Sequence, residues 1–232
     1  IFILSEALIF LSGDRSAFFY INLSAIFVIL FSQKLLKLRL FTLSCSILLL
    51  MIISFFNQTA YERVVTHTLQ DMNLNKVDEK VYIFSKAHNA YYISSYKMFL
   101  DNKILGVGVK NFRNVCSDKR YFVYGEEYCN THPHNTYIQL LAETGIIGTF
   151  FLLTVLSYFC KYLFKHLFLK FRGKYYFNDF EICVLSGIAI YLWPFVPTGN
   201  VFNNWLNIAL ILNLPFLIWS RKSNKAKNYY KY

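Results

Sequence analysis

The stretch Tyr137–Phe159, YIQLLAETGIIGTFFLLTVLSYF, decides the class of protein. A helix needs about 20 mainly apolar residues to cross the hydrocarbon core of a bilayer, and this stretch has that length. The composition of the 232-residue chain agrees, because 56% of it is hydrophobic, 19% is aromatic and the mean hydropathy is +0.35. The sequence therefore predicts a membrane protein.

Five further apolar segments resemble this stretch, so we expect an all-α, multi-pass transmembrane helical bundle. The six predicted spans are Ile1–Ser12, Ser16–Ser32, Leu40–Phe56, Tyr137–Phe159, Ile182–Val196 and Trp205–Trp219. The chain starts inside an apolar run at Ile1, with no initiator Met and no charged leader. We therefore interpret it as the C-terminal part of a longer protein.

Positive charges are concentrated in three connections of this predicted bundle. They are Lys34, Lys37 and Arg39 in the first, Lys161, Lys165, Lys170, Arg172 and Lys174 in the second, and Arg221, Lys222, Lys225, Lys227 and Lys231 in the tail. Connections rich in Lys and Arg stay in the cytoplasm, and these three alternate correctly with the spans. They also explain the net charge of +11, so we expect no nucleic-acid partner.

The other connections are then expected outside the cell membrane, and they include Arg15, the uncharged turn Pro197–Asn204 and the long segment 57–136. We predict a single membrane domain, residues 1–232, into which residues 57–136 are inserted as one large, mainly helical loop. Apolar residues at helical spacing predict an amphipathic helix over Glu79–Leu100 that lies on the membrane face. These residues are Val81, Phe84, Tyr92, Tyr96 and Phe99.

Two of the five cysteines, Cys116 and Cys129, fall in this outer loop. In a bacterium that compartment is the oxidising periplasm, so a disulfide between them is expected. The alternative is a pair of free thiols in a loop too open to bring them together. The other three cysteines lie in or beside apolar spans, where thiols behave as small packing residues.

Two histidines, His132 and His134, stand directly before the apolar stretch that opens this section. Pro133 fits the first turn of a helix, so we expect that helix to start around His132 to Asn135. Free backbone N–H groups at a helix start favour anions such as phosphate. Ionisable groups beside hydrocarbon are candidates for function.

Polar residues recur every four positions along the start of this helix, at Asn135, Gln139 and Glu143. They share one face, which must turn toward protein or a wet cavity. We expect these three residues to support the site. For Gln139 and Glu143 the alternative is that they only hold helices together. Gly145 and Gly148 are explained by close helix packing.

An imidazole with an ordinary pKa near 6.5 suits general-base work at neutral pH. A His-x-His pair is also half of a metal site, but no Cys or Asp lies nearby at a suitable spacing, and His67 and His88 are distant in sequence. We therefore expect no metal and no cofactor.

Arg15 lies between two predicted spans on the same outer side as His134. A guanidinium binds phosphate oxygens in a bidentate manner and keeps its charge, so Arg15 is a candidate for binding phosphate. The alternatives are an ion pair with Asp14 or a side chain that reaches the membrane interface for solvation alone.

Three motifs resemble the O-antigen ligase and O-antigen polymerase family. The first is His134-Asn135, followed after nine residues by Gly145 and after two more by Gly148. The second is the Gly-x-Gly-x-x-x-Phe stretch from Gly106 to Phe112, and the third is the position of Arg15, which resembles a Ser-Arg-Gly motif.

The resemblance implies a GT-C-like, multi-pass glycosyltransferase of the bacterial inner membrane, with its active site and the loop 57–136 facing the periplasm. It implies transfer of a glycan from an undecaprenyl diphosphate carrier to an acceptor, which is lipid A core for a ligase or the growing glycan for a polymerase. It also implies that His134 is the catalytic base, that Arg15 binds the diphosphate, and that no metal takes part. Membrane lipids are the remaining expected partner.

The chain departs from the family pattern at a second arginine, which is expected upstream of the Gly-x-Gly stretch. Lys86, His88 and Lys97 stand there instead. Arg113 and Arg120 are possible substitutes downstream, and we expect Arg113 to bind the diphosphate.

Two other functions are considered. A glycoside hydrolase needs two carboxyl groups across the sugar, and only the adjacent pair Glu126 and Glu127 is offered in the loop. A polysaccharide transporter or channel needs polar groups along the whole path, whereas here they gather at the outer face.

Overall fold

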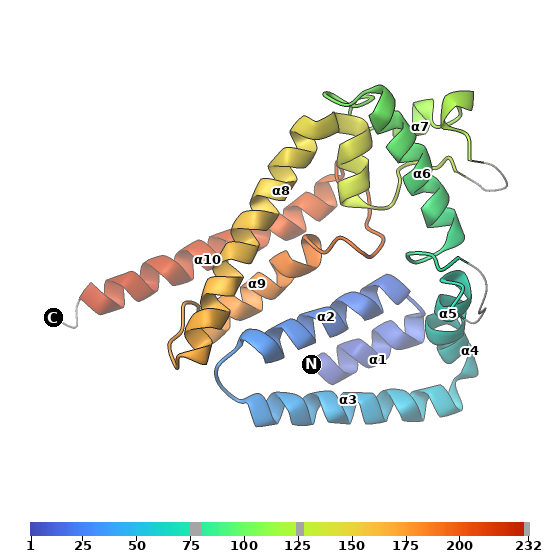
Figure 1. Cartoon of the computed structure of the whole chain (residues 1–232). Coiled ribbons are helices and arrows are strands. Elements are labelled where there is room, and N and C mark those ends of the chain that lie inside the picture. The colour runs from blue at the N-terminus through green and yellow to red at the C-terminus, as the bar shows by residue number, and fades with distance from the viewer. Residues whose placement is uncertain (75–79, 124–127, 230–232) are drawn as a thin grey trace. The chain divides into compact units, whose positions relative to one another are not determined.

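The computed structural model describes residues 1–74, 80–123 and 128–229, and over these residues the protein is all-α, as the sequence predicts (Figure 1). In chain order the elements are α1 (Phe2–Ser12), α2 (Arg15–Phe31), α3 (Leu36–Phe56), α4 (Gln58–Tyr61), the π-helical turn η1 (Glu62–Thr66), α5 (His67–Asp71), α6 (Lys86–Asp101), α7 (Phe112–Val115), the 3-10 turn η2 (Lys119–Tyr121), α8 (Thr136–Phe171), α9 (Asp179–Tyr191) and α10 (Asn204–Tyr229). The chain divides into two compact units. The first contains Ile1–Val64, Cys160–Trp193 and Ile208–Tyr232, and the second contains Val65–Phe159 and Pro194–Asn207.

Every predicted span coincides with a helix, but their lengths differ. Among the described residues, α3 with 21 residues and α8 with 36 residues are long and apolar enough to cross a membrane, whereas α1 and α2 are apolar but shorter. The predicted span Ile182–Val196 is wrong at its end, because α9 stops at Tyr191. Pro194 explains this, since proline lacks a backbone N–H and disfavours helix in the residue before it. The crossing of all six helices stays a prediction.

The surface of α3 has the character of a helix surrounded by lipid. Phe41, Met51 and Phe55 are 66%, 58% and 80% exposed. Soluble proteins rarely leave so long an apolar surface uncovered. Ser46 is the one buried residue of α3, so this helix buries none of its apolar side chains, as expected of a helix that meets hydrocarbon.

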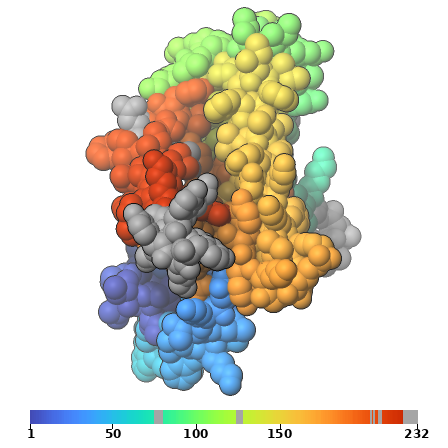
Figure 2. All heavy atoms as spheres, turned by 90° about the vertical axis from the view of Figure 1, so that its left-hand side faces the viewer, coloured from blue at the N-terminus to red at the C-terminus, as the bar shows by residue number. Residues whose placement is uncertain are grey.

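The three basic connections meet at one end of the first unit. Asp179 Oδ1 accepts a hydrogen bond of 2.8 Å from the backbone N–H of Gln33, and Asp179 Oδ2 pairs with Arg39 at 3.2 Å. Lys170 Nζ donates to the carbonyl oxygen of Ser32 at 3.0 Å. The connection between α2 and α3 is thus tied to the ends of α8 and α9, and Figure 2 shows these blue and orange segments on one side of the unit.

The last helix joins the same end through a buried carboxylate. Glu181, which is 2% exposed, accepts hydrogen bonds from the backbone N–H of Asn178 at 3.1 Å and from the Ser220 hydroxyl at 3.2 Å. Arg221 Nε lies 3.4 Å from Glu181 Oε1. Asn178 in turn caps α9 in a capping box with Glu181.

The core of the second unit lies under the loop that precedes α8. It is formed by residues from α6, α7, η2 and α8 that are nearly or completely buried. They are Met98, Phe112, Cys116, Tyr121 and Ala142. Residues 75–79 and 124–127 lie outside the described parts, so the pair Glu126 and Glu127 is not placed.

The predicted amphipathic helix Glu79–Leu100 is shorter in the structure. It begins at Lys86, because Phe84 has a φ of 85° and the Ser85 hydroxyl accepts the backbone N–H of His88 at 3.3 Å as an N-cap. Glu79 itself lies outside the described residues. The buried face also differs from the predicted one and consists of Ala90, Tyr91, Ser94, Ser95 and Met98.

The helix α8 is not continuous, which corrects the prediction of one uninterrupted span over Tyr137–Phe159. Gly145 has φ 61° and ψ −155°, and the chain changes direction there, after a short segment of residues 136–144 (Figure 1). A Cβ atom at Gly145 would lie 2.4 Å from the carbonyl oxygen of Ile104, so this glycine admits a loop rather than a packed helix. Residues 146–171 still span about 39 Å at 1.5 Å per residue.

The Gly-x-Gly loop bonds to the backbone groups that this break exposes. The N–H groups of Val107 and Gly108 donate to the carbonyl oxygens of Ala142 and Glu143 at 2.9 and 3.0 Å. A helix end leaves such carbonyls without partners, so the loop acts as the cap. A Cβ atom at Gly106, where φ is 66°, would lie 2.4 Å from the backbone carbon of Glu143.

The side chain of Glu143 holds the same loop from inside. It is 1% exposed, and its Oε1 accepts the backbone N–H of Phe112 at 2.8 Å. Its Oε2 accepts the N–H of Lys110 at 3.2 Å and Nε2 of Gln139 at 3.0 Å. Three donors satisfy this buried carboxylate, which would otherwise be strongly unfavourable.

We predict that Gly106→Ala destabilises the second unit by about 2–4 kcal/mol, because it adds a clash with backbone to the left-handed conformation. Gly173→Ala is the matched control, since Gly173 has φ 69° but no atom within 4 Å of its Cβ position. Thermal unfolding in detergent, followed by circular dichroism, measures both variants. Equal effects would show that the contact with α8 contributes nothing.

Candidate active site

The segment Thr131–Asn135 forms a compact turn ahead of α8. Asn135 caps the helix, since its Oδ1 accepts the N–H groups of Tyr137 and Ile138 at 3.0 and 3.1 Å. His134 has a φ of 54°, a left-handed conformation that is rare for residues other than glycine. The helix therefore starts at Thr136. We had expected Pro133 in its first turn, but Pro133 lies before that turn.

A distant segment holds this turn through Thr198. The N–H of Thr198 donates to the carbonyl oxygen of His134 at 2.9 Å, and its own carbonyl lies 3.4 Å from His132 Nε2. The Thr198 hydroxyl lies 3.1 Å from the Thr136 hydroxyl. Asn135 Nδ2 also donates to the carbonyl of Pro194 at 2.7 Å. From sequence, residues 197–204 are predicted only as an uncharged turn, and nothing local in the chain indicates this role of Thr198.

The His134 imidazole lies in a cluster of aromatic rings within the second unit. Its centroid is 4.0 Å from that of His132, 5.5 Å from His88 and 5.8 Å from Tyr91. His88 and Tyr91 are three residues apart and so lie on one face of α6. From the sequence, this spacing could indicate only that the two rings lie side by side. The contact itself joins residues too far apart in sequence to be predicted from one chain.

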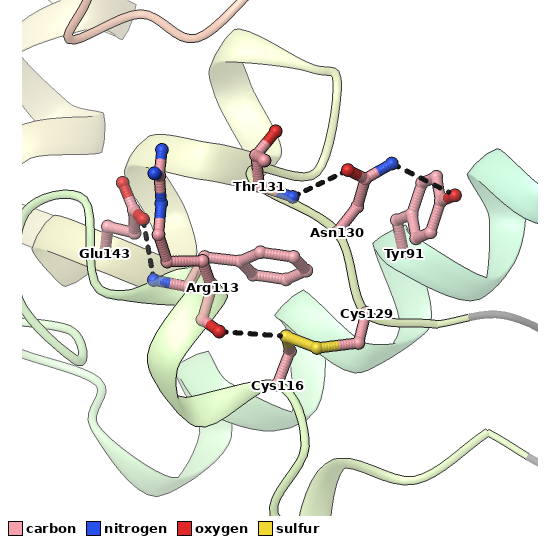
Figure 3. The surroundings of a disulfide bond; sticks show 8 residues. Tyr91, Arg113, Cys116, Cys129, Asn130, Thr131 and Glu143 are labelled. Atoms are coloured by element: carbon pink, nitrogen blue, oxygen red, sulfur yellow. Dashed lines mark hydrogen bonds between the residues drawn. A yellow bond between two sulfur atoms is a disulfide. The ribbon is translucent and has the colours of Figure 1, made fainter.

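Asn130 favours one tautomer of the His134 ring. Its Nδ2 lies 3.3 Å from His134 Nε2. The same nitrogen lies 3.3 Å from the Tyr91 hydroxyl, as Figure 3 shows. Because an amide nitrogen only donates, His134 Nε2 accepts and the ring proton sits on Nδ1. Neither Asn130 nor Tyr91 was among the predicted site residues.

Burial disfavours the charged form of both histidines of the turn. Burial lowers the pKa of His134 below its ordinary value of 6.5. The pKa of His132 falls to about 4, first through burial, then through repulsion from His134 when both rings are protonated and, to a smaller extent, through the charge of Arg113. A neutral imidazole is the form that can accept a proton.

The stripe of Asn135, Gln139 and Glu143 is buried and faces protein. Gln139 is 0% exposed, and its Nε2 donates to Asn200 at 2.9 Å while its Oε1 accepts the N–H of Val201 at 3.0 Å. Their polar groups bond to the segment of residues 194–201 and to the Gly-x-Gly loop. These side chains therefore orient the site from behind rather than reaching toward a substrate.

The disulfide joins Cys116 at the end of α7 to Cys129, with 5.1 Å between their Cα atoms. Figure 3 shows it next to Asn130 and Thr131, where it connects the turn to the core of the second unit. Asn130 Oδ1 accepts the N–H of Thr131 at 2.7 Å. The segment that carries His132 and His134 is thereby anchored at its start.

The candidate arginines differ in their surroundings. Arg113 is exposed on α7, and its guanidinium makes no ion pair with any residue that the structure describes. Arg120 pairs with Asp118 at 2.7 Å and with Asp101 at 3.6 Å, so it is already engaged. Arg15 is half-buried at the start of α2 in the first unit, directly after Asp14, whose carboxylate caps that helix.

Within the described ranges, no three His, Cys, Asp or Glu residues are grouped so that they could hold a metal ion. Lys97 is one of the residues that stand where the family pattern has its second arginine, and its Nζ donates to the carbonyl of Phe122 at 2.6 Å. Arg113 thus remains the exposed cation within electrostatic reach of His132.

Comparison with known proteins agrees with these motifs. The family model described as O-Antigen ligase matches residues 1–153, which include the turn with His132 and His134 and the Gly-x-Gly loop. No curated protein and no solved structure matches the chain. Since the match covers well over half of the sequence, the chain belongs to the O-antigen ligase family.

Proposed function

We propose that this chain transfers a glycan from an undecaprenyl diphosphate carrier to an acceptor hydroxyl, with His134 as the general base. Membership of the O-antigen ligase family implies a membrane-bound glycosyltransferase of the ligase or polymerase type that acts on lipid-linked glycans. The single observation that carries the assignment is the environment of His134. Its half-buried imidazole contacts Asn130 through Nε2, its backbone carbonyl accepts the N–H of Thr198, and burial lowers its pKa, which favours the form that can accept a proton.

The proposed step is a direct displacement. Nε2 of His134 takes the proton of the acceptor hydroxyl as that oxygen attacks the anomeric carbon of the glycan. The bond between this carbon and the diphosphate oxygen breaks, and the diphosphate leaves as an anion, so no general acid is required. The acceptor hydroxyl takes the place of Asn130 Nδ2, whose contact at 3.3 Å is long for a hydrogen bond.

Arg113 and Arg15 are proposed to bind the diphosphate. The charge of Arg113 contributes to the lowered pKa of His132, so a phosphate bound by Arg113 would lie near the histidine cluster. Arg15 supplies a second guanidinium if the first unit delivers the lipid carrier. His132, Asn135, Gln139 and Glu143 support the site by orienting His134 and the helix behind it. The reaction is proposed to need no metal ion and no other cofactor.

The proposed arrangement in the membrane is multi-pass, as one membrane domain with residues 57–136 inserted in the periplasm. The convergence of three basic connections at one end of the first unit supports a common cytoplasmic side for them. The active site then faces the periplasm, where lipid-linked glycans are joined.

The acceptor is proposed to be lipid A core, which makes the chain a ligase, and joining of repeat units by a polymerase is the alternative. No residue of the site distinguishes the two acceptors. The lipopolysaccharide ladder of a deletion strain does, because loss of a ligase removes all capped core. Loss of a polymerase leaves core that carries one repeat.

We predict that His134→Ala lowers glycan transfer by about 10²–10⁴-fold without loss of protein, as expected for removal of a positioned base. His132→Ala should lower it less. His67→Ala is the control, because His67 is an exposed histidine on α5. The assay uses purified protein and a lipid-linked donor, with and without chelator. Activity retained in His134→Ala would remove the assignment, and loss on chelation alone would favour a metal site.

Arg15→Lys is expected to lower transfer strongly at unchanged protein level, since an ammonium cannot bind two phosphate oxygens as a guanidinium does. Arg113→Lys should behave similarly. Arg120→Lys serves as the control, because Arg120 is occupied by Asp118 and Asp101. Near-normal transfer by Arg15→Lys would mean that Arg15 only reaches the membrane interface.

The orientation predicts that exposed positions on the two units are labelled from opposite sides. Lys119→Cys in the second unit and Lys174→Cys in the first are placed in a background without Cys45, Cys160 and Cys183, while the disulfide is kept. A membrane-impermeant maleimide should reach Lys119→Cys in intact spheroplasts and Lys174→Cys only after lysis. Labelling of both without lysis would show that the orientation is wrong.

A further inference from the structure

Two cations meet over one aromatic ring at the basic end of the first unit. Lys165 Nζ and Arg221 Cζ each lie 4.5 Å from the centroid of the Tyr176 ring. They are therefore no farther apart than the sum of these two distances. Tyr162 stacks on the same ring, with 5.4 Å between centroids and 28° between planes. Two like charges within this distance raise the positive potential around the ring, which favours an anion nearby.

The carboxylates at this end do not neutralise the charge. Asp179 pairs with Arg39, and Glu181 pairs with Arg221. Eight cations of the three basic connections have no carboxylate within ion-pair distance among the residues that the structure describes. They are Lys34, Lys37, Lys161, Lys165, Lys170, Arg172, Lys174 and Lys222.

Arg221 is fixed so that part of its guanidinium stays available. Its Nε faces Glu181 at 3.4 Å, and its Cζ lies 4.5 Å from the Phe177 ring as well as from Tyr176. Within the described parts of the chain, its two η nitrogens donate no hydrogen bond. Lys165 is exposed, so its ammonium is open to a ligand from outside.

We infer that Lys165, Tyr176 and Arg221 form a binding site for the phosphate of an anionic phospholipid headgroup. Basic groups between helices at the cytoplasmic face are suited to such headgroups, and tyrosines favour the level at which headgroups lie. The neighbouring helices offer apolar surface for acyl chains, since Phe164 and Phe168 on α8 are 69% and 55% exposed. This site is independent of the proposed glycan transfer.

The test uses the purified full chain and native mass spectrometry of retained lipid. The protein is expected to retain phosphatidylglycerol in preference to phosphatidylcholine. Lys165→Gln should weaken retention about fivefold, the effect of one basic residue at a charged membrane surface. Tyr176→Leu is a second variant that should also weaken retention. If neither variant folds, the unaltered protein still tests the preference, because its retention of phosphatidylglycerol is compared with its retention of phosphatidylcholine.

Two controls carry the same loss of charge. Lys37→Gln removes a cation from the same end but outside the ring cluster, and Lys119→Gln removes an exposed cation from the second unit. Both should retain more phosphatidylglycerol than Lys165→Gln. Equal losses in all three variants, or equal retention of the two lipids by the native protein, would overturn the site. Displacement of the lipid by inorganic phosphate at equal concentration would make free phosphate the ligand instead.

Discussion

The arrangement of the second unit depends on the buried carboxylate of Glu143. It accepts hydrogen bonds from the backbone of Lys110 and Phe112 and from Gln139, while its own carbonyl accepts the N–H of Gly108. An unpaired charge at 1% exposure would be strongly unfavourable, so the loop and the helix must form together. The break at Gly145 is possible because this loop satisfies the backbone groups that it exposes.

The short helix that results is held at both ends, and this is how the fold positions the candidate base. Its C-terminal end is bonded to the Gly-x-Gly loop, and its N-terminal end carries Asn135 and the turn with His134. Thr198 and Pro194 fasten that turn from a segment beyond residues 1–153. The part of the chain that matches the family model therefore supplies the imidazole, and the rest supplies part of its support.

Much of the helical organisation could be predicted from apolar runs, because the requirement for about 20 apolar residues leaves a strong signal. The break in α8 could not, since apolar residues continue on both sides of Gly145 and the loop that permits the break is distant in sequence. The start of α6 could have been predicted from Ser85, since serine is a good N-cap. The apolar spacing continued before Ser85 and therefore favoured an earlier start.

The candidate site follows the same division. The two histidines and the polar stripe are local in sequence and were predicted, as was the pair of cysteines that the structure joins. His88, Tyr91 and Thr198 were missed because only folding brings them to the turn. Arg120 offered the right charge, but its two carboxylate partners were not evident from the sequence.

The most direct test of His134 as the base is the pH dependence of glycan transfer by the purified chain at limiting donor, where kcat/KM reports the pKa of the free protein. A base acts when unprotonated, and burial lowers the pKa of His134 below its ordinary value of 6.5. The rate should therefore stay constant at neutral pH and fall tenfold per pH unit on the acid side of an apparent pKa below 6.5. An apparent pKa above 6.5, or a rate that does not fall in acid, would contradict the account.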